Sequence, residues 1–320
     1  MTLLYYNPTF LEHETGKHPE RPERLVQIVR QLERTGLDAK CVRPAWEAAS
    51  DLQLARVHEP SYAAEVEAFA RHGGGRIEED TLCSPQSYDV ARLAVGAVCD
   101  AVGRVVRGED TQALCLVRPP GHHALRSAAM GFCLFNNVAV GARTAVAEFG
   151  LDRVLIVDFD VHHGNGTQAI FWDDPQVGFF SIHRWPFYPG TGDSDETGTG
   201  AALGTKLNLP VEFGTARADY LAQFQGGLER IAAKMRPDLI LISAGFDAHR
   251  DDPVGSLGLE IEDFGALTNL VLDVADVHSG SRVVSVLEGG YNTGILAGSV
   301  ALHLGEMLAR NRRSRTVGGC

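Results

Sequence analysis

The chain has 320 residues, of which 44% are hydrophobic and 22% are charged, as in an ordinary folded globular protein. Its formal net charge of −12, from 29 basic and 41 acidic side chains, argues against nucleic acid as the main partner. We find neither a signal peptide nor an apolar run of about 18 residues that would span a membrane, so we expect a cytoplasmic protein. The six cysteines form no CxxC pair and predict reduced core thiols rather than disulfides.

Apolar runs typical of strands alternate along the chain with segments typical of helices. Strands are predicted at 113–117, 154–157, 177–182, 239–243 and 282–287. Helices are predicted at 21–35, 61–71, 87–107, 134–149, 217–236, 260–278 and 293–309. Most of the strands are apolar on both faces, which indicates a parallel sheet covered by helices on both sides. The sequence therefore predicts an α/β fold.

We expect this fold to form a single domain over residues 1–310. The Gly- and Thr-rich segment 189–205 lacks the GK[ST] ending of a phosphate loop and predicts an ordered surface loop. The last residues, RNRRSRTVGGC, are basic and end in glycines. Residues 311–320 are therefore expected to form a flexible tail.

Polar side chains cluster where the predicted strands end. Beyond the five strands the sequence continues with RPPGHHA, DFDVHHGNGT, HRWPFYPGTGD, AGFDAHRDDPVG and EGGYN. Each segment combines His, Asp or Tyr with Gly or Pro. A single GHH is more often an ordinary turn, but ligands of parallel sheets bind beyond the carboxyl ends of the strands. Five such ends at one edge of a sheet predict a functional site.

The segment DFDVHHGNGT places Asp158, Asp160 and His162 two residues apart, so they start on one face of the strand end. Two neighbouring buried carboxylates raise each other's pKa unless a cation joins them. Asp160 and His162, with Asp247 from another strand end, offer the oxygen and nitrogen ligands of a divalent-metal site with an open position for water. The alternative is that Asp158 and Asp160 only cap loop amides.

The paired imidazoles of His122 and His123 suit general acid–base catalysis, because histidine titrates near neutral pH. Tyr291 follows two glycines and can place its phenol against a developing oxyanion, although a simple core or rim tyrosine is the alternative. Together with a metal ion, these groups describe metal-assisted hydrolysis of a carbonyl compound.

Seven segments resemble motifs of the histone deacetylase and acetylpolyamine amidohydrolase superfamily, and they occur in the order found in that family. They are HPERPERL (18–25), RPPGHHA (118–124), GFCLFNN (131–137), DFDVHHGNGT (158–167), FYPGTGD (187–193), SAGFDAH (243–249) and EGGYN (288–292). The resemblance is to the bacterial, class II-like branch, because Asn165 stands where class I enzymes carry Asp. It implies the arginase/deacetylase fold, with one eight-stranded parallel sheet.

The resemblance implies one zinc ion per chain, bound by Asp160, His162 and Asp247, with Fe²⁺ or Co²⁺ as alternative metals. It implies that His123 is the general base and then the general acid in the attack of metal-activated water. His122, paired with Asp158, acts electrostatically. The chain is thereby expected to be a zinc-dependent deacetylase that hydrolyses linear amide bonds.

Further roles follow from the same resemblance. Tyr291 is expected to polarise the amide carbonyl. Gly131 and Phe132 are expected to line the acyl-lysine tunnel, with Tyr188 as the opposite aromatic wall. Arg24 is expected to line an internal channel for the product acetate.

The resemblance also implies a structural potassium ion beside the zinc. The expected ligands are the Asp158 carboxylate, the Ser181 hydroxyl and the backbone oxygens of Asp160, His162 and Ile182. The two cations, with His122, would balance the buried acids.

Asn165 is expected to orient His123 through an uncharged hydrogen bond. A neutral partner stabilises the imidazolium less than a carboxylate does, so His123 should be a weaker base than its class I counterpart.

The substrate is less closely specified than the chemistry. Removal of acetyl or other short acyl groups from acyl-lysine is one prediction, and deacetylation of acetylpolyamines or other small acylated amines is the alternative. Polyamine-specific members carry Glu on the rim near the position of Val254, which favours the first prediction. Asp80, in the loop IEEDT with Glu78 and Glu79, is the candidate for gripping the substrate backbone and can equally bind a polyamine. Homo-oligomerisation stays open.

Two other classes of function are less favoured. A manganese ureohydrolase of the same fold needs additional Asp ligands for a second metal, whereas the paired histidines and Tyr291 suit deacetylation. A catalytically inactive binding protein would have lost Tyr291, a metal ligand or His123, and none of these is lost.

Overall fold

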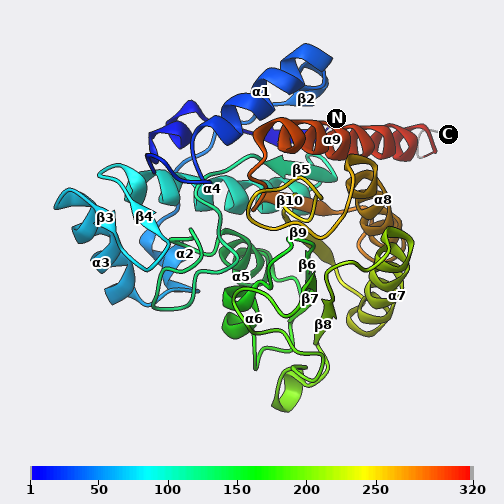
Figure 1. Ribbon diagram of the computed structural model, residues 1–320. Helices are drawn as coiled ribbons and strands as arrows, with labels where there is room; N and C mark the ends of the chain where they lie inside the picture. Colours follow the sequence, from blue (N-terminus) through cyan, green and yellow to red (C-terminus); the bar gives the residue numbers. More distant parts are fainter. Residues whose placement is uncertain (1, 318–320) are drawn as a thin grey trace.

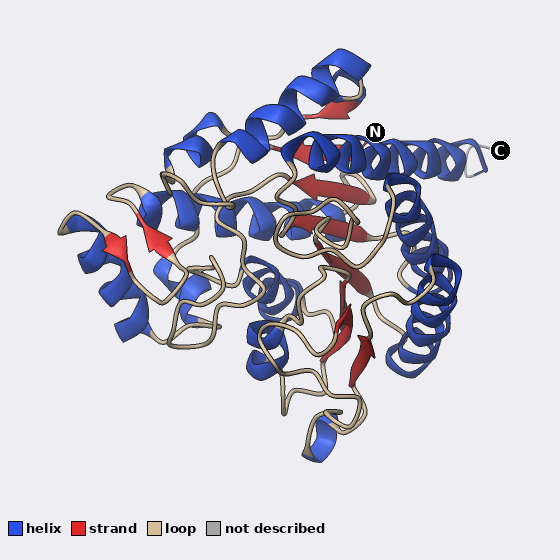
Figure 2. Ribbon diagram, in the orientation of Figure 1, coloured by secondary structure: helices blue, strands red, loops and turns tan. Residues whose placement is uncertain are grey.

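The computed structural model describes the backbone of residues 2–317 and the side chains of residues 2–311. An eight-stranded parallel sheet runs through the chain in the order β2–β1–β5–β10–β9–β6–β7–β8, as Figure 1 and Figure 2 show. Its strands are β1 (Thr2–Tyr5), β2 (Cys41–Val42), β5 (Gln112–Cys115), β6 (Val154–Asp158), β7 (Val177–Arg184), β8 (Lys206–Val211), β9 (Leu239–Ala244) and β10 (Val283–Leu287). The predicted α/β fold and its eight-stranded sheet are confirmed.

Helices cover both faces of the sheet (Figure 1). One face carries α1 (Glu23–Thr35), α7 (Arg217–Met235), α8 (Ile261–His278) and α9 (Thr293–Val317). The other carries α4 (Ser87–Val106) and α5 (Asn137–Phe149), which pack against each other. The shorter elements are η1 (Pro8–Glu12), η2 (Asp38–Lys40), α2 (Asp51–Ala55), α3 (Pro60–Arg71), α6 (Asn165–Ile170) and η3 (Gly200–Ala202), with the small hairpin β3 (Gly75–Arg76) and β4 (Leu82–Cys83).

The central strands are mostly apolar because both of their faces are covered. Every residue of β5, β6, β9 and β10 is buried. These strands and the helices around them form one continuous hydrophobic core. Five described cysteines are free thiols and four of them are buried, as expected, while Cys320 lies outside the described residues.

Three strands of the sheet were not predicted, and each lies at or near an edge. β1 and β2 are too short to give a periodic pattern. β8 contains Lys206, Asn208 and Pro210, which weaken its strand signal. Proline is tolerated there because β8 is an edge strand and needs fewer ladder hydrogen bonds.

The structure bears on two further predictions about the chain, the loop at 189–205 and the end of the last helix. The segment 189–205 is a loop that contains only the short helix η3. The last helix, α9, continues to Val317 rather than ending at 309. Side chains beyond residue 311 lie outside the described residues, so the flexible tail stays a prediction. Within the described part of the chain, no helix combines the length and apolarity needed to cross a membrane.

The sheet brings the loops after β6, β9 and β10 side by side, because these strands are neighbours in register. Asp158 at the end of β6 pairs with Ser243 of β9, and Ala244 of β9 pairs with Leu287 of β10. The segments that follow therefore leave the sheet at the same edge. This edge is where the predicted site residues meet.

Candidate active site

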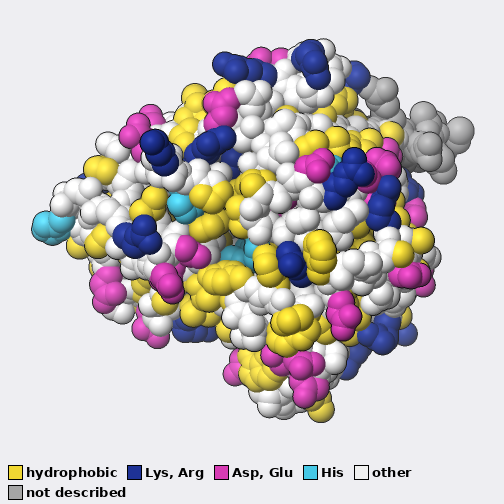
Figure 3. All heavy atoms as spheres, viewed as in Figure 1, with side chains coloured by type: hydrophobic (Ala, Val, Ile, Leu, Met, Phe, Trp, Pro, Cys, Tyr) yellow, Lys and Arg dark blue, Asp and Glu magenta, His cyan; other side chains and the backbone are white. Residues whose placement is uncertain are grey.

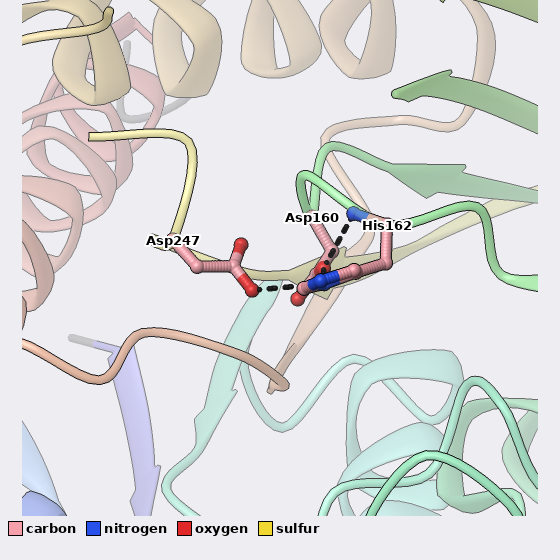
Figure 4. A group of neighbouring side chains, drawn as sticks. All are labelled: Asp160, His162 and Asp247. Carbon is pink, nitrogen blue, oxygen red and sulfur yellow. Dashed lines mark hydrogen bonds and ion pairs between the residues drawn. The ribbon is translucent and has the colours of Figure 1, made fainter. Parts of the chain in front are cut away.

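The side chains of Asp160, His162 and Asp247 meet in a buried cluster at this edge of the sheet. Asp160 and His162 follow β6, and Asp247 follows β9. The His162 ring turns its Nδ1 edge toward both carboxylates in Figure 4, with Nδ1 2.9 Å from Asp160 Oδ1 and 3.2 Å from Asp247 Oδ2. One ligand atom from each residue lies within 4.8 Å of the other two.

The cluster has the features of a metal site. Asp247 Oδ2 is buried and has no hydrogen-bond partner. The second oxygen of each carboxylate is fixed by the backbone. Asp160 Oδ2 accepts the N–H of Gly289 at 2.8 Å, and Asp247 Oδ1 accepts the N–H of Val161 at 2.9 Å. Two carboxylates and one imidazole are a donor set suited to a catalytic divalent cation.

Glycine keeps the space beside the two carboxylates free. A Cβ atom added to Gly289 would lie 2.2 Å from Asp247 Oδ2 and 2.4 Å from Asp160 Oδ2. A Cβ atom at Gly245 would lie 2.1 Å from Asp160 Oδ2. The residues present therefore fit a metal ion, both by donor chemistry and by the glycine-lined space around them.

The electrostatics of the cluster point the same way. Burial and, to a smaller extent, the negative charge of Asp160 raise the pKa of Asp247 to about 7. Burial also opposes ionisation of Asp160, but His122 and His162 hold the pKa of this carboxyl well below its ordinary value. Burial lowers the pKa of His162, yet its contacts with both carboxylates outweigh that and raise it to about 10. A cation among these groups relieves the repulsion between the carboxylates.

The paired histidines have opposite electrostatic environments. His122 Nδ1 lies 3.0 Å from Asp158 Oδ2. Burial opposes the charge of His122, but Asp158 and Asp160 raise its pKa to about 10. Burial and the neighbouring charges of His122 and His162 hold the pKa of His123 well below its ordinary value. The two rings are 4.0 Å apart, so one charged and one neutral imidazole lie side by side.

The neutral ring of His123 is oriented by Asn165, the first residue of α6. The His123 Nδ1 atom lies 2.7 Å from Asn165 Oδ1, an acceptor, so Nδ1 carries the hydrogen. His123 Nε2 is therefore left as the basic nitrogen. This bond joins residues 42 positions apart in the sequence.

Glu288 supports the paired histidines and was not predicted. Its Oε2 atom accepts the N–H groups of Gly121 at 2.7 Å and His122 at 3.2 Å, and Oε1 accepts the hydroxyl of Ser243 at 3.1 Å. Burial raises the pKa of Glu288 to about 7. In the sequence it follows the apolar run of β10 directly and is the first residue of EGGYN, but nothing there assigned it a partner.

Tyr291 lies above the cluster and is held from two sides. Asp252 Oδ2 accepts its backbone N–H at 2.7 Å, and Arg24 lies over its ring at 5.0 Å. The buried guanidinium of Arg24 donates to the carbonyls of Gly290, at 2.7 Å, and Glu288. Burial raises the pKa of the Tyr291 phenol well above its ordinary value, so it stays protonated.

Asp252 was also not predicted, although it joins two parts of the site. Its other oxygen, Oδ1, accepts the N–H groups of Val254 at 2.9 Å and Gly255 at 3.0 Å. One carboxylate therefore fixes both the Tyr291 backbone and the loop that carries Val254. Its only signal in the sequence was the DDP turn, which is a common surface pattern.

A narrow pocket of about 130 Å³ leads to the histidines. Figure 3 shows a hollow near the centre of this face, with histidine at its base and hydrophobic side chains around it. The pocket is lined by Asp80, His123, Gly131, Phe132, His162, Phe187, Tyr188, Val254 and Tyr291. All the residues predicted for the tunnel therefore lie on one cavity, together with Phe187, which was not predicted.

Aromatic rings form the walls of this pocket. Phe132 meets Tyr291 edge to face at 5.7 Å, and Tyr188 meets His123 in the same manner at 5.3 Å. Phe187 stacks on the His162 ring at 5.3 Å. Phe132 has a φ of +70°, an unusual conformation for a bulky residue, and its N–H donates to the Thr81 hydroxyl at 3.0 Å.

Glycine is required at the residue before Phe132. Gly131 has a φ of +56°, and a Cβ atom there would lie 2.4 Å from His123 Cδ2. Both its backbone conformation and its close approach to His123 exclude a larger side chain.

The rim of the pocket carries Asp80 and Val254 on opposite loops. Asp80 is half-buried beside Glu78, and burial together with that contact raises the pKa of its carboxyl. The Thr81 hydroxyl lies 3.2 Å from Asp80 Oδ1, and His18 packs against Phe132 at 4.5 Å. The predicted gripping residue thus reaches the mouth of the tunnel.

The expected potassium ligands lie at the end of β6, in the segment that follows it, and in the second half of β7. Asp158 and Ser181 are paired in the sheet and both are fully buried. Asp158 Oδ1 accepts the backbone N–H of Asp160 at 3.1 Å, and Ser181 Oγ lies 2.9 Å from His183 Nδ1. Ile182 continues β7 into this region.

Comparison with known proteins identifies the family. A family model described as the histone deacetylase domain matches residues 18–307. Polyamine deacetylase HDAC10 of Homo sapiens is 41% identical over 302 residues, which are 90% of this chain and 44% of that protein. A histone deacetylase-like amidohydrolase of Pseudomonas aeruginosa is 39% identical over 276 residues, covering 86% of this chain and 73% of that protein.

Comparison of the fold with solved structures points to the same family. The crystal structure of the HDA15 HD domain matches with a TM-score of 0.90 at 34% identity, covering 97% of this chain and 90% of that one. The chain belongs to the histone deacetylase family, and its arginase/deacetylase fold is confirmed. The family consists of hydrolases that act on acylated amines.

Proposed function

We propose that the protein is a zinc-dependent deacetylase that removes acetyl or other short acyl groups from the side-chain amine of acyl-lysine. The observation that carries this proposal is that His162, a member of the buried cluster with Asp160 and Asp247, lines the same pocket as His123 and Tyr291. Aromatic rings line much of this pocket, which also contains groups suited to amide hydrolysis.

Asp160, His162 and Asp247 are the proposed metal ligands. A Zn²⁺ ion bound by them would supply Lewis-acid catalysis, by polarising the acyl carbonyl and lowering the pKa of water. The orphan oxygen of Asp247 and the space kept by Gly289 support this assignment. Fe²⁺ and Co²⁺ suit the same mixed ligands.

His123 is the proposed general base and general acid. Its Nδ1–H is committed to Asn165, so Nε2 takes the proton from the attacking water and then gives it to the leaving amine. His122 remains cationic through its pair with Asp158 and stabilises negative charge in the transition state. The phenol of Tyr291 stays protonated and donates a hydrogen bond to the oxyanion.

Other roles are proposed for residues around these groups. Gly131, Phe132 and Tyr188 confine the aliphatic part of the substrate, and Asp80 grips its backbone at the mouth. Arg24, buried beneath Tyr291, lines the exit for acetate. Asp158, with Ser181 and nearby backbone oxygens, holds a potassium ion that helps to balance the buried acids.

Deacetylation of an acetylpolyamine or another small acylated amine is the second candidate. It is favoured by the acids Glu78, Glu79 and Asp80 beside the mouth and by the likeness to a protein named as a polyamine deacetylase. Val254 argues for the lysine substrate, because an apolar rim residue offers a second ammonium group no partner.

The test is turnover of acetyl-lysine peptide, trifluoroacetyl-lysine peptide, acetylputrescine and acetylspermidine, with and without chelator. The proposal predicts hydrolysis of the lysine substrates that chelator abolishes and added Zn²⁺ restores. A preference for the polyamines would indicate that Asp80 and the neighbouring acids select the substrate. Val254→Glu should then be measured on the same panel, with increased polyamine turnover expected if this rim position selects the substrate.

The remaining alternatives make different predictions in the same assay. A manganese ureohydrolase needs a two-metal cluster, whereas among the described residues Asp160, His162 and Asp247 form one three-residue group. Two manganese ions per chain, with turnover of a guanidinium compound, would overturn the proposal. No hydrolysis of any amide by metal-replete protein would favour an inactive binding protein.

A further inference from the structure

Arg184, the last residue of β7, contacts two aromatic rings beside the pocket. Its guanidinium carbon lies 4.1 Å from the centre of the Phe187 ring and 4.7 Å from the centre of the Phe213 ring. Phe187 in turn stacks on His162, with ring centres 5.3 Å apart and an angle of 19° between the ring planes. Because a guanidinium group is planar and positively charged, contact with aromatic faces is favourable and fixes the orientation of the rings.

The same guanidinium is bonded to the loop after β9. Its Nη1 atom donates to the backbone oxygens of Gly255, at 2.9 Å, and Ser256, at 3.2 Å. Ser256 has a φ of +62°, a conformation that residues with a side chain seldom adopt. Val254, the residue directly before this turn, lines the pocket. Arg184 therefore helps to hold the loop that carries Val254.

Arg184 is well placed to connect these two loops because its own backbone is fixed. Its N–H donates to the carbonyl of Val161 at 2.8 Å, and it pairs with Val211 of β8 in the sheet. Among the described residues that line the pocket, Phe187 and Val254 come from the two loops that Arg184 contacts, whereas Arg184 itself is not one of them. Its influence on a substrate must therefore pass through its neighbours.

We propose that Arg184 is a positioning residue that holds the Phe187 wall and the Val254 rim of the pocket in place and so determines how tightly the substrate binds. This inference rests on the proposed function. The contact with the guanidinium keeps the Phe187 ring against His162, and the two hydrogen bonds keep the Val254 loop beside it. A wall contacts the substrate equally in the ground state and the transition state, so Arg184 acts on binding rather than on the chemical step.

The first test compares the steady-state kinetics of Arg184→Met and Arg184→Lys with those of the natural chain, on the amide that the natural chain hydrolyses best. Methionine fills much of the same space but has neither charge nor donors, so KM should rise about 10-fold while kcat stays within about 2-fold. Lysine keeps the charge and loses the planar group, so its KM should lie between the two. Arg250→Met is the matched control. Arg250 is an exposed arginine of the same loop that pairs with Glu260, and its loss should change neither constant.

The second test asks whether Arg184 acts through the Phe187 ring. Phe187→Leu keeps an apolar wall and removes the aromatic face. When it is combined with Arg184→Met, KM should rise by about 3-fold less than the product of the two separate effects, because both changes break the same contact. Melting temperatures are measured in parallel, since a purely structural role of Arg184 would lower them without changing KM.

Crystal structures of the natural chain and of Arg184→Met give a readout that needs no activity. The proposal expects the Phe187 ring of the variant to leave its stacked position on His162. Arg184→Lys takes the place of Arg184→Met in each measurement if the methionine variant does not fold.

An unchanged KM, a fall in kcat at constant KM, or independent effects of Arg184→Met and Phe187→Leu would each overturn the proposal. So would a Phe187 ring that stays on His162 in the variant. If the natural chain hydrolyses none of the amides, the proposed function fails, and the position of the Phe187 ring alone then decides whether Arg184 positions this wall.

Discussion

At the scale of single residues, the amide of Asn165 orients His123 without adding a charge beside it. Asn165 Oδ1 accepts from His123 Nδ1, and an amide carries no charge to stabilise an imidazolium. Burial and the neighbouring charges of His122 and His162 also hold the pKa of His123 below its ordinary value. The proposed base is therefore neutral and ready to accept a proton at neutral pH.

Asn165→Asp should raise the pKa of His123, because a carboxylate at the same position favours the protonated ring. The acidic limb of the kcat/KM profile should move to higher pH by about 1 unit. The measurement is a pH–rate profile of the natural chain and the variant on the better substrate of the panel. A melting temperature close to that of the natural chain serves as the control, and an unmoved acidic limb would refute the assignment of His123 as base.

Gly289 illustrates how a missing side chain can define a site. Gly289→Ala places a methyl group about 2 Å from both proposed metal-binding carboxylates, so bound metal should fall well below one ion per chain. Metal content by elemental analysis checks this without an activity assay. Gly294→Ala is the control, because its nearest contact would be Asn292 Oδ1 at 3.9 Å. Full metal content in Gly289→Ala would place the ion elsewhere.

At the scale of elements, the loop after β7 is fastened by Glu196. The Glu196 carboxylate accepts the N–H groups of Gly192, at 3.1 Å, and Asp193, at 3.2 Å, and the side-chain amide of Gln168 at 2.5 Å. The same loop carries Tyr188, one wall of the pocket. Glu196 therefore acts as a positioning residue for a wall that it does not touch.

Glu196→Ala should raise KM about 5-fold and leave kcat within about 2-fold, because the loop loosens while the metal cluster is unchanged. Steady-state kinetics separate the two effects. Asp195→Ala, which removes an exposed acid from the same loop, should leave both constants unchanged. A fall in kcat at constant KM would show that Glu196 acts on the chemical step instead.

At the scale of the whole molecule, buried neutral histidines make stability depend on pH. His58 Nε2 accepts the N–H of Asn136 at 2.9 Å, and Nδ1 lies 3.0 Å from the carbonyl of Leu125. Burial lowers its pKa to about 4, and burial lowers the pKa of His303 to about 4 as well. Protonation of His58 would break the bond to Asn136, because Nε2 must remain an acceptor.

Since the folded pKa of His58 lies below the unfolded value of about 6.5, the unfolded chain takes up a proton first as the pH falls. Its contribution to stability is complete above about pH 6.5 and is lost towards pH 4, at about 1.4 kcal/mol per pH unit. His58→Asn should reduce the pH slope of the free energy of unfolding by about this amount. Urea titrations between pH 7 and 4.5 measure it, with the exposed His72→Asn as control. An unchanged slope in His58→Asn would refute this assignment.

Most of the site could be predicted because its residues lie in local patterns. Asp160 and His162 are two residues apart at a strand end, and Asp247 lies just beyond the end of another strand. Parallel topology brings such ends together, so the convergence followed from the sequence. Glu288 and Asp252 could not be predicted, because their partners, such as Gly121 and Tyr291, lie 167 and 39 positions away.

The sequence by itself determined the α/β alternation, the family and the residue types of the site. Each of these can be recognised from a short motif or from the pattern of apolar residues along the chain. The tertiary structure decided the contacts between distant segments. It set which oxygen of Asp247 is free, which ring of the paired histidines is neutral, and that Lys206 is buried among backbone oxygens. These depend on where separate loops meet, and a backbone carbonyl leaves no trace in the sequence that would reveal its partner.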